Sequence, residues 1–360
     1  MHEFCETLYA KFEETGRNKM SMSIQSTFKN PFRALVLTGA VAGALLLGPQ
    51  AVEAKTVLRL TDVSSDKHPN HDAYKAMAER IKERTNGEVT LELFPNSALG
   101  TSQEQMEQLQ RGAVDLALVS AHQLQTINPR VLLHRAPYVF DGYDHVRSFM
   151  TGPGKAWWEK EVADSGFTYI APFEWGFRQM SNALRPINSP DDLNGMKMRV
   201  TNDPMLQTLF RSLGANVVTM NFQEVYMGLA TKAIDGQDNP INITYDVKFH
   251  EVIDHFALTN HAYTTAILIA NNASWNELTD EQKAIFQEEA DKAGAIAHEA
   301  VKALDKEVLG IFKEAGIKIT EPDPAPFRAL MKETYEYVDG AAGGQGAMDE
   351  FIALVDSARK

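Results

Sequence analysis

The sequence predicts an α/β protein of two lobes, each built on a mostly parallel sheet flanked by helices. The order strand, helix, strand, helix, strand occurs twice, over 57–119 and again over 196–236. A chain of 360 residues is long enough for two hydrophobic cores. An apolar pattern of helical period over 279–316 is longer than one lobe. Because ligands of parallel sheets bind beyond the carboxyl ends of the strands, the cleft between the lobes is the expected site.

The N-terminal region has the pattern of a secretory signal. An apolar run from Ala34 to Gly48 follows Lys29 and Arg33, and it is too short for a comfortable membrane span. Small residues at 52 and 54 stand where a signal peptidase reads the chain, so we expect cleavage after Ala54. The sequence therefore predicts that residues 1–54, an extension followed by a signal peptide, are removed on export to the periplasm of a Gram-negative bacterium.

Composition narrows the classes of function. The net charge of −13 argues against nucleic acid or an anionic membrane surface as a partner. The single cysteine, Cys5, lies in the segment predicted to be removed, so the mature chain is expected to have no disulfide and no cysteine-bound metal. An acidic protein that binds an anion must gather its positive charge locally.

Glycines and capping residues set the bounds of the predicted elements in both units. Asn86-Gly87, Gly112 and Gly214 are helix stops, and the box Asn221-Phe-Gln-Glu224 caps a helix start. The first unit comprises strand 57–63, helix 70–85, strand 88–94, helix 102–111 and strand 114–119. The second comprises strand 196–200, helix 204–213, strand 217–220, helix 222–231 and strand 233–236.

The C-terminal third is predicted to be mainly helical. A capping box from Thr279 to Gln282 starts a helical pattern that holds until Gly316. A continuous helix would be roughly 54 Å long at 1.5 Å per residue. It would therefore either bridge both lobes or break near Gly294 or Gly310. Further helices are expected over 327–338 and 348–358, with a mobile glycine-rich segment over 339–346.

One strand of the second unit carries a basic side chain of special interest. Met196, Met198 and Val200 alternate with Lys197 and Arg199, as in a strand with one buried face. This pattern alone places Arg199 opposite the apolar face, on a solvated basic surface.

Signatures of common enzymes are absent from the sequence. It has no Walker loop, no Gly-x-Ser-x-Gly elbow and no His-Glu-x-x-His motif. The run His68-Pro-Asn-His71 is more typical of a loop and helix cap than of a metal site, and we expect no cofactor. The run from Phe173 to Arg178 stands at the boundary between the units, where it is either a buried crossover strand or a ligand-stacking wall.

Six stretches of the sequence match the motifs of a known family, in the same order along the chain. They are Phe94-Pro-Asn-Ser-Ala-Leu-Gly100, Gly112-Ala-Val-Asp115, Arg135-Ala-Pro-Tyr-Val-Phe140, Asn188-Ser-Pro-Asp-Asp-Leu-Asn-Gly-Met-Lys-Met-Arg-Val200, Glu224-Val-Tyr226 and Ala233-Ile-Asp-Gly-Gln-Asp-Asn-Pro240. With them the chain resembles the extracytoplasmic solute-binding proteins of tripartite ATP-independent periplasmic (TRAP) transporters, the DctP-like receptors. The resemblance covers essentially the whole mature length.

The resemblance implies a periplasmic binding protein fold that closes on a carboxylated solute by hinge motion. In the family, the arginine matched by Arg199 binds the ligand carboxylate with two parallel hydrogen bonds, and the one matched by Arg178 supports it. Asn239 matches an asparagine that binds the carboxylate or a polar group beside it, and Phe222 an aromatic that lines the pocket. Further residues expected at the cleft are Trp175 as a stacking surface and Ser120, Asp62, Asn202 and His68 as hydrogen-bonding groups.

The family also implies a domain division and a partner. We expect lobe I to comprise 55–176 and 264–304, and lobe II 177–263 and 305–360, with the long C-terminal helix bridging the lobes. The partner would be the membrane permease subunits of a TRAP transporter, and the receptor is expected to be a monomer.

The expected ligand is a sugar acid such as a uronate or an aldonate. The sialic-acid branch of the family has an acidic residue where Ser120 stands, which disfavours sialic acid. A C4-dicarboxylate or 2-oxo acid is the alternative within the class. From other classes, an exported hydrolase of acidic sugars would need paired carboxylates or a nucleophile–base pair, which the sequence does not show. A binding protein that signals to a sensor domain is a third possibility.

Overall fold

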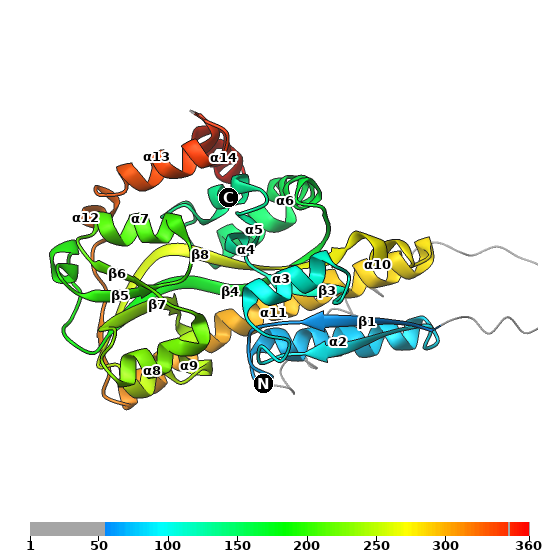
Figure 1. The fold of residues 1–360 in the computed structure, drawn as a ribbon, viewed down its shortest axis with the longest axis horizontal. Coiled ribbons are helices and arrows are strands. Elements are labelled where there is room, and N and C mark those ends of the chain that lie inside the picture. Colours follow the sequence, from blue (N-terminus) through cyan, green and yellow to red (C-terminus); the bar gives the residue numbers. More distant parts are fainter. Residues whose placement is uncertain (1–54, 345, 360) are drawn as a thin grey trace, which may run out of the picture.

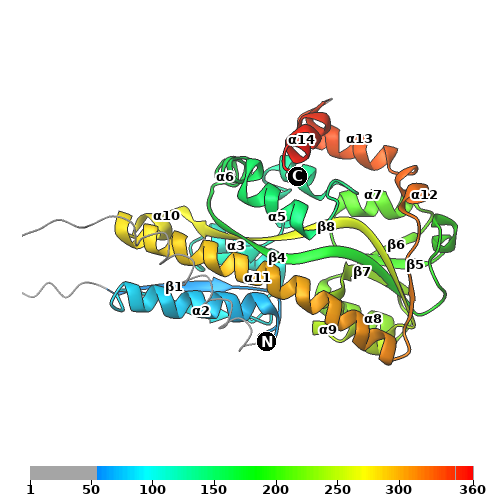
Figure 2. The ribbon, with the colours of Figure 1, turned by 180° about the vertical axis from the view of Figure 1, so that it is seen from behind.

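The computed structural model describes residues 55–344 and 346–359, which form a nine-stranded mixed sheet covered by helices (Figures 1 and 2). The predicted signal segment 1–54, with Cys5, lies outside these residues. The strand order is β2-β1-β3-β8-β4-β7-β5-β6, and β9 pairs with β8. The strands are β1 Thr56–Thr61, β2 Val89–Phe94, β3 Leu116–Val119, β4 Phe167–Asn182, β5 Lys197–Val200, β6 Asn216–Thr219, β7 Gly236–Pro240, β8 His255–Asn271 and β9 Lys318–Thr320.

The two predicted lobes occupy opposite halves of this sheet. In lobe I, β1 pairs in parallel with β2 and β3, and in lobe II, β5 pairs in parallel with β6 and β7. The helices are α2 Pro69–Arg84, α3 Ser102–Gln110, α4 Ala121–Leu124, α5 Tyr143–Thr151, α6 Pro153–Asp164, α7 Pro204–Ser212, α8 Val225–Ala230, α9 Ile241–Asp246, α10 Asn272–Asn276, α11 Asp280–Glu314, α12 Pro324–Arg328, α13 Lys332–Ala341 and α14 Ala347–Asp356. Short 3₁₀ helices are η1 Pro129–Arg135, η2 Pro190–Leu193, η3 Phe222–Glu224 and η4 Phe249–Val252. The repeated order of elements is thus confirmed.

Two long antiparallel strands join the lobes into one sheet. β4 and β8 pair along most of their length and pass through both lobes (Figure 1). The crossover-strand interpretation of Phe173–Arg178 is therefore right, whereas β8 has no counterpart in the sequence-based expectation. Nearly all residues of both strands are buried, so neither shows the alternation that reveals a half-exposed strand. The boundary expected between lobe I and lobe II, after residue 176, falls where the pairing of β4 with β8 shifts register, between Glu174 and Gly176.

One predicted strand was misplaced. The third strand of the second unit was expected over 233–236, but β7 starts at Gly236 and continues to Pro240. The residues Gln237, Asp238 and Asn239 are buried and polar, and their side chains find hydrogen-bond partners inside the protein. An apolar-pattern criterion does not recognise such a strand.

The C-terminal helices differ in one place from expectation. α11 is continuous, packs against α2 and β4, and reaches α9, so it bridges both lobes without a break at Gly294 or Gly310 (Figure 2). The helix expected over 327–338 is instead divided into α12 and α13. The Asp339 carboxylate, within α13, accepts hydrogen bonds from the backbone of Gly346 at 3.0 Å and Met348 at 2.9 Å.

No helix of the described residues is long and apolar enough to cross a bilayer.

Candidate functional site

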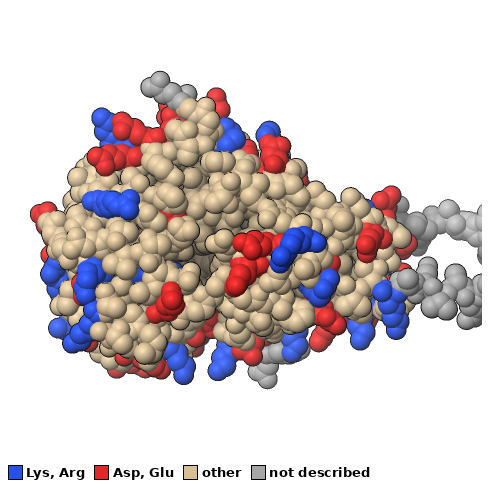
Figure 3. Space-filling model, in the orientation of Figure 1, with Lys and Arg blue, Asp and Glu red and all other residues tan. Residues whose placement is uncertain are grey.

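A cavity opens between the lobes, near the carboxyl ends of the parallel strands (Figure 3). It encloses about 640 Å³ of empty space, part of it open to solvent. The lining residues are Val63, Ser64, Ser102, Ser120, His122, Gln123, Trp175, Arg178, Arg199, Thr201, Phe222, Asn239, Pro240, Ile243, Asp246, Val247 and Thr264. Six residues predicted from the sequence are among them: Arg199, Arg178, Asn239, Phe222, Trp175 and Ser120.

Arg178 is held in place by the two strands beside β4. Its Nε donates to Asp238 Oδ2 and its Nη2 to the Asp238 carbonyl, both on β7, while Nη1 donates to Thr264 Oγ1 of β8 at 3.2 Å. Burial raises the pKa of Asp238, but Arg178 and His261 more than offset this and hold it well below its usual range. Three of the five guanidinium N–H groups are thereby used, which leaves two for a ligand.

Arg199 has a different environment. Its Nε and Nη2 donate to the Met220 carbonyl at 3.0 and 2.8 Å, and within the described residues no carboxylate lies at ion-pair distance. Its side chain is only 1% exposed, so the solvated face indicated by the strand pattern was wrong. Burial lowers the pKa of Arg199 to about 10, which still leaves it protonated at neutral pH. Nη1 and the second N–H of Nη2 remain for a ligand carboxylate.

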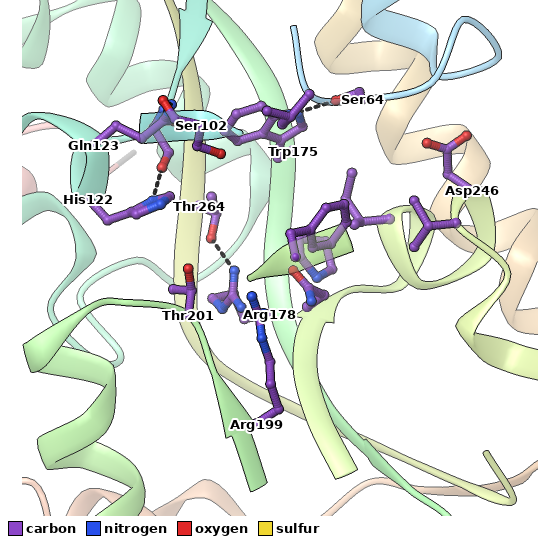
Figure 4. A pocket seen from close by; sticks show the side chains of 17 residues that line it. Ser64, Ser102, His122, Gln123, Trp175, Arg178, Arg199, Thr201, Asp246 and Thr264 are labelled. Atoms are coloured by element: carbon purple, nitrogen blue, oxygen red, sulfur yellow. Dashed lines mark hydrogen bonds between the residues drawn. The ribbon is translucent and has the colours of Figure 1, made fainter. Parts of the chain in front are cut away.

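Beside the arginines lies a neutral histidine that the sequence did not single out. His122 Nδ1 is hydrogen-bonded to Ser120 Oγ at the start of α4 (Figure 4). Burial lowers the pKa of His122 well below its ordinary value, and the charges of Arg135, Arg178 and Arg199 lower it further. It therefore adds hydrogen-bonding capacity to the cavity without adding charge.

The remaining wall combines amide and aromatic groups. Asn239 Nδ2 donates to Gln237 Oε1 at 2.6 Å, which fixes the amide at the end of β7. Trp175 Nε1 donates to Ser64 Oγ at 2.9 Å, and its ring borders the cavity (Figure 4). Phe222 packs edge-on against Phe249, with ring centres 5.7 Å apart. The site thus pairs a cationic region with flat apolar surfaces and neutral hydrogen-bonding groups.

Comparison with known proteins shows the family of this chain. Residues 60–340 match bacterial extracellular solute-binding protein, family 7. The chain belongs to this family. Its members include the periplasmic solute-binding proteins of TRAP transporters. The 2,3-diketo-L-gulonate-binding periplasmic protein of Escherichia coli (strain K12) is 31% identical over 288 residues, 80% of this chain and 88% of that protein.

Solved structures of TRAP periplasmic solute-binding proteins share the fold. One from Roseobacter denitrificans, with bound β-D-glucuronate, matches with a TM-score of 0.79 and 26% identity over 84% of this chain and 99% of that chain. Another, from Sulfurospirillum deleyianum with bound succinate, matches with a TM-score of 0.78 and 26% identity over 85% and 100%. The two-lobed fold of this TRAP receptor is therefore confirmed.

Three expected cleft residues of the receptor do not line the cavity. Asp62 is fully buried, and its Oδ1 accepts from the Ser64 backbone at 3.0 Å. His68 caps α2, since its Nδ1 accepts from the Asn70 backbone at 3.2 Å. Asn202 lines a neighbouring hollow, which shares His122, Thr201 and other residues with the cavity. The cap role of His68 agrees with the loop-and-cap interpretation of its motif.

Another buried ion pair of the receptor escaped prediction. Arg135 Nη1 lies 2.8 Å from Asp203 Oδ2, and both side chains are almost fully buried. Arg135 lies in one of the six stretches that match the family, but no pattern in the neighbouring sequence predicts that its charged side chain is buried. Arg135 with Asp203 and Arg178 with Asp238 leave Arg199 as the surplus positive charge at this site. Within the described ranges no group of three His, Cys, Asp or Glu residues could hold a metal ion.

Proposed function

We propose that this protein is the periplasmic receptor of a TRAP transporter for a sugar acid such as a uronate or aldonate. The ligand carboxylate binds Arg199 and Arg178, and cleft closure excludes water around it. The single observation that carries the proposal is the buried Arg199 guanidinium, which has no carboxylate partner in the described chain. A buried charge without a counterion is costly, and a ligand carboxylate supplies that counterion.

Neutral groups around the arginines support a hydroxyl-rich ligand. Ser120, His122, Thr201 and Asn239 can hydrogen-bond to hydroxyls, while Trp175 and Phe222 offer flat surfaces to a sugar ring. The Roseobacter denitrificans neighbour carries β-D-glucuronate, and the Escherichia coli relative is named for 2,3-diketo-L-gulonate. The succinate-bound neighbour keeps a C4-dicarboxylate as the alternative ligand.

The lining favours binding over catalysis. Glycoside hydrolysis ordinarily uses two carboxyl groups that flank the scissile bond. Asp246 is the one carboxylate among the residues that line this cavity. We therefore assign no catalytic step to this cavity.

We also propose that residues 1–54 direct export of the chain, that the receptor is a monomer, and that it delivers its ligand to the TRAP permease subunits.

A thermal-shift screen against acidic metabolites tests the proposal. A sugar acid present at 100 times its dissociation constant should stabilise the protein by about 2.7 kcal/mol. The matched neutral sugar, which lacks the carboxylate, should give no shift. Stabilisation by the neutral sugar alone would contradict the carboxylate assignment, and turnover of the bound acid would favour a hydrolase.

A further inference from the structure

The cavity has a negative end as well as a positive one. Figure 4 shows the Asp246 side chain well apart from Arg178 and Arg199, on the side of the pocket opposite His122. A ligand that is anchored by its carboxylate at the arginines and also fills this side of the cavity would meet a carboxylate of the protein there.

Asp246 is fixed in this place by the opposite lobe. It is the last residue of α9 in lobe II, and its Oδ1 accepts from the hydroxyl of Ser65, which follows β1 in lobe I. Its Oδ2 accepts from the Ser65 backbone N–H at 3.2 Å. Each oxygen retains a lone pair, so the carboxylate can accept a further hydrogen bond from a ligand.

No cation of the described chain forms an ion pair with Asp246. Lys67 and Lys248 share a neighbouring surface groove with it, but within the described chain neither forms an ion pair with it. A second carboxyl group lies close by: burial raises the pKa of Asp62 to about 7, and the charge of Asp246 adds to this rise. This end of the cavity therefore disfavours any further negative charge.

We propose that Asp246 makes the site selective for singly charged sugar acids over aldarates, the matching sugar diacids. A carboxylate oxygen can only accept hydrogen bonds, so it favours a ligand hydroxyl at the end remote from the anchored carboxylate. A second ligand carboxylate there would face a like charge, which weakens its binding. The inference rests on the proposed function and specifies its ligand class: aldonates and uronates bind, whereas aldarates, which carry a second carboxylate at the remote end, are rejected.

Matched pairs of ligands test this selectivity by calorimetry. Galactonate and galactarate, or gluconate and glucarate, differ in the terminal group, a hydroxymethyl against a carboxylate. Of the two pairs, the one whose monoacid binds the wild-type receptor more tightly is used for the comparison. In that pair, the dissociation constant of the diacid should exceed that of the monoacid by at least about 50-fold. Asp246→Asn keeps an acceptor for Ser65 but removes the charge and adds a donor, so the preference should fall to about fivefold or less.

Ser65→Ala is the control for a purely structural role. It removes the hydroxyl contact between the lobes and leaves the Asp246 carboxylate, so both ligands should weaken by the same factor and the preference should persist. A preference in Asp246→Asn equal to that of the wild type would overturn the inference, because Asp246 would then only hold the lobes together. Binding of no sugar acid by the wild type would instead overturn the proposed function and the inference with it.

Discussion

At the scale of single residues, the charges buried around the cleft explain why an acidic protein can bind an anion. Arg178 and Arg135 each have an aspartate partner, whereas Arg199 has only the Met220 carbonyl. Strand alternation could not reveal this, because the Met220 carbonyl that accepts from Arg199 lies 21 residues further along the chain. Family resemblance supplied Arg199 and Arg178, but His122, Asp246 and the Arg135–Asp203 pair required the structure.

Besides Asp62, a second buried carboxyl group, that of Asp305, makes the free energy of unfolding depend on pH. Asp305 of α11 accepts hydrogen bonds from the Tyr143 hydroxyl and, at 2.7 Å, from Asn242 Nδ2. Burial, which the hydrogen bonds only partly offset, raises the pKa of Asp305 to about 7, above its unfolded value of 3.8. The folded state therefore binds the proton more tightly, so stability is greatest below pH 4 with respect to this group and falls as pH rises toward 7.

We predict that Asp305→Asn stabilises the protein at pH 8 and changes little at pH 4. Asparagine resembles the protonated carboxyl group, and the gain at pH 8 is at most about 4 kcal/mol, from about 1.4 kcal/mol for each pKa unit. Urea unfolding at both pH values measures it. An equal effect of the substitution at pH 4 and pH 8 would show that Asp305 does not titrate in this way.

At the scale of elements, glycines that the sequence marked as possible breaks have different roles in a continuous helix. A Cβ at Gly294 would lie 2.1 Å from the Pro172 carbonyl oxygen of β4, so this glycine allows α11 to approach the sheet. A Cβ at Gly310 would meet no atom within 4 Å. The pattern of apolar residues predicted α11 and most strands of the two units. It failed for β7 and β8, because buried polar residues and strands buried on both faces carry no alternation.

Gly294→Ala and Gly310→Ala form a matched pair. Gly294→Ala should destabilise the protein by about 1–3 kcal/mol, because the helix must move away from β4. Gly310→Ala should stabilise it by about 0.5–1 kcal/mol through helix propensity alone. Chemical denaturation of both variants checks the difference in sign, and destabilisation by both would contradict the assigned roles.

At the scale of the whole molecule, contacts across the cleft hold the lobes in the observed arrangement. Gln223 Nε2 of lobe II donates to Ser97 Oγ of lobe I at 3.1 Å, and Gln125 Nε2 donates to the Asn202 carbonyl at 3.4 Å. The repeated units of the sequence predicted two lobes. They could not predict these contacts, because each joins residues from different lobes and depends on how the lobes meet.

The Gln223–Ser97 contact should affect ligand release more than ligand entry. Gln223→Ala removes a hydrogen bond across the cleft mouth, so we expect the dissociation rate to rise about two- to fivefold with little change in the association rate. Stopped-flow fluorescence with Gln207→Ala on α7 as the control measures both rates. A change confined to the association rate would contradict a role in closure.

The most direct measurement is calorimetry of a bound sugar acid with Arg199→Lys, because it tests the carboxylate anchor itself. Lysine keeps the positive charge but cannot offer two parallel donors, so the dissociation constant should rise at least about tenfold while the fold is retained. Arg211→Lys, on the exposed side of α7, should bind as the wild type does. Wild-type affinity in Arg199→Lys would contradict the assignment of Arg199 as the group that holds the ligand carboxylate.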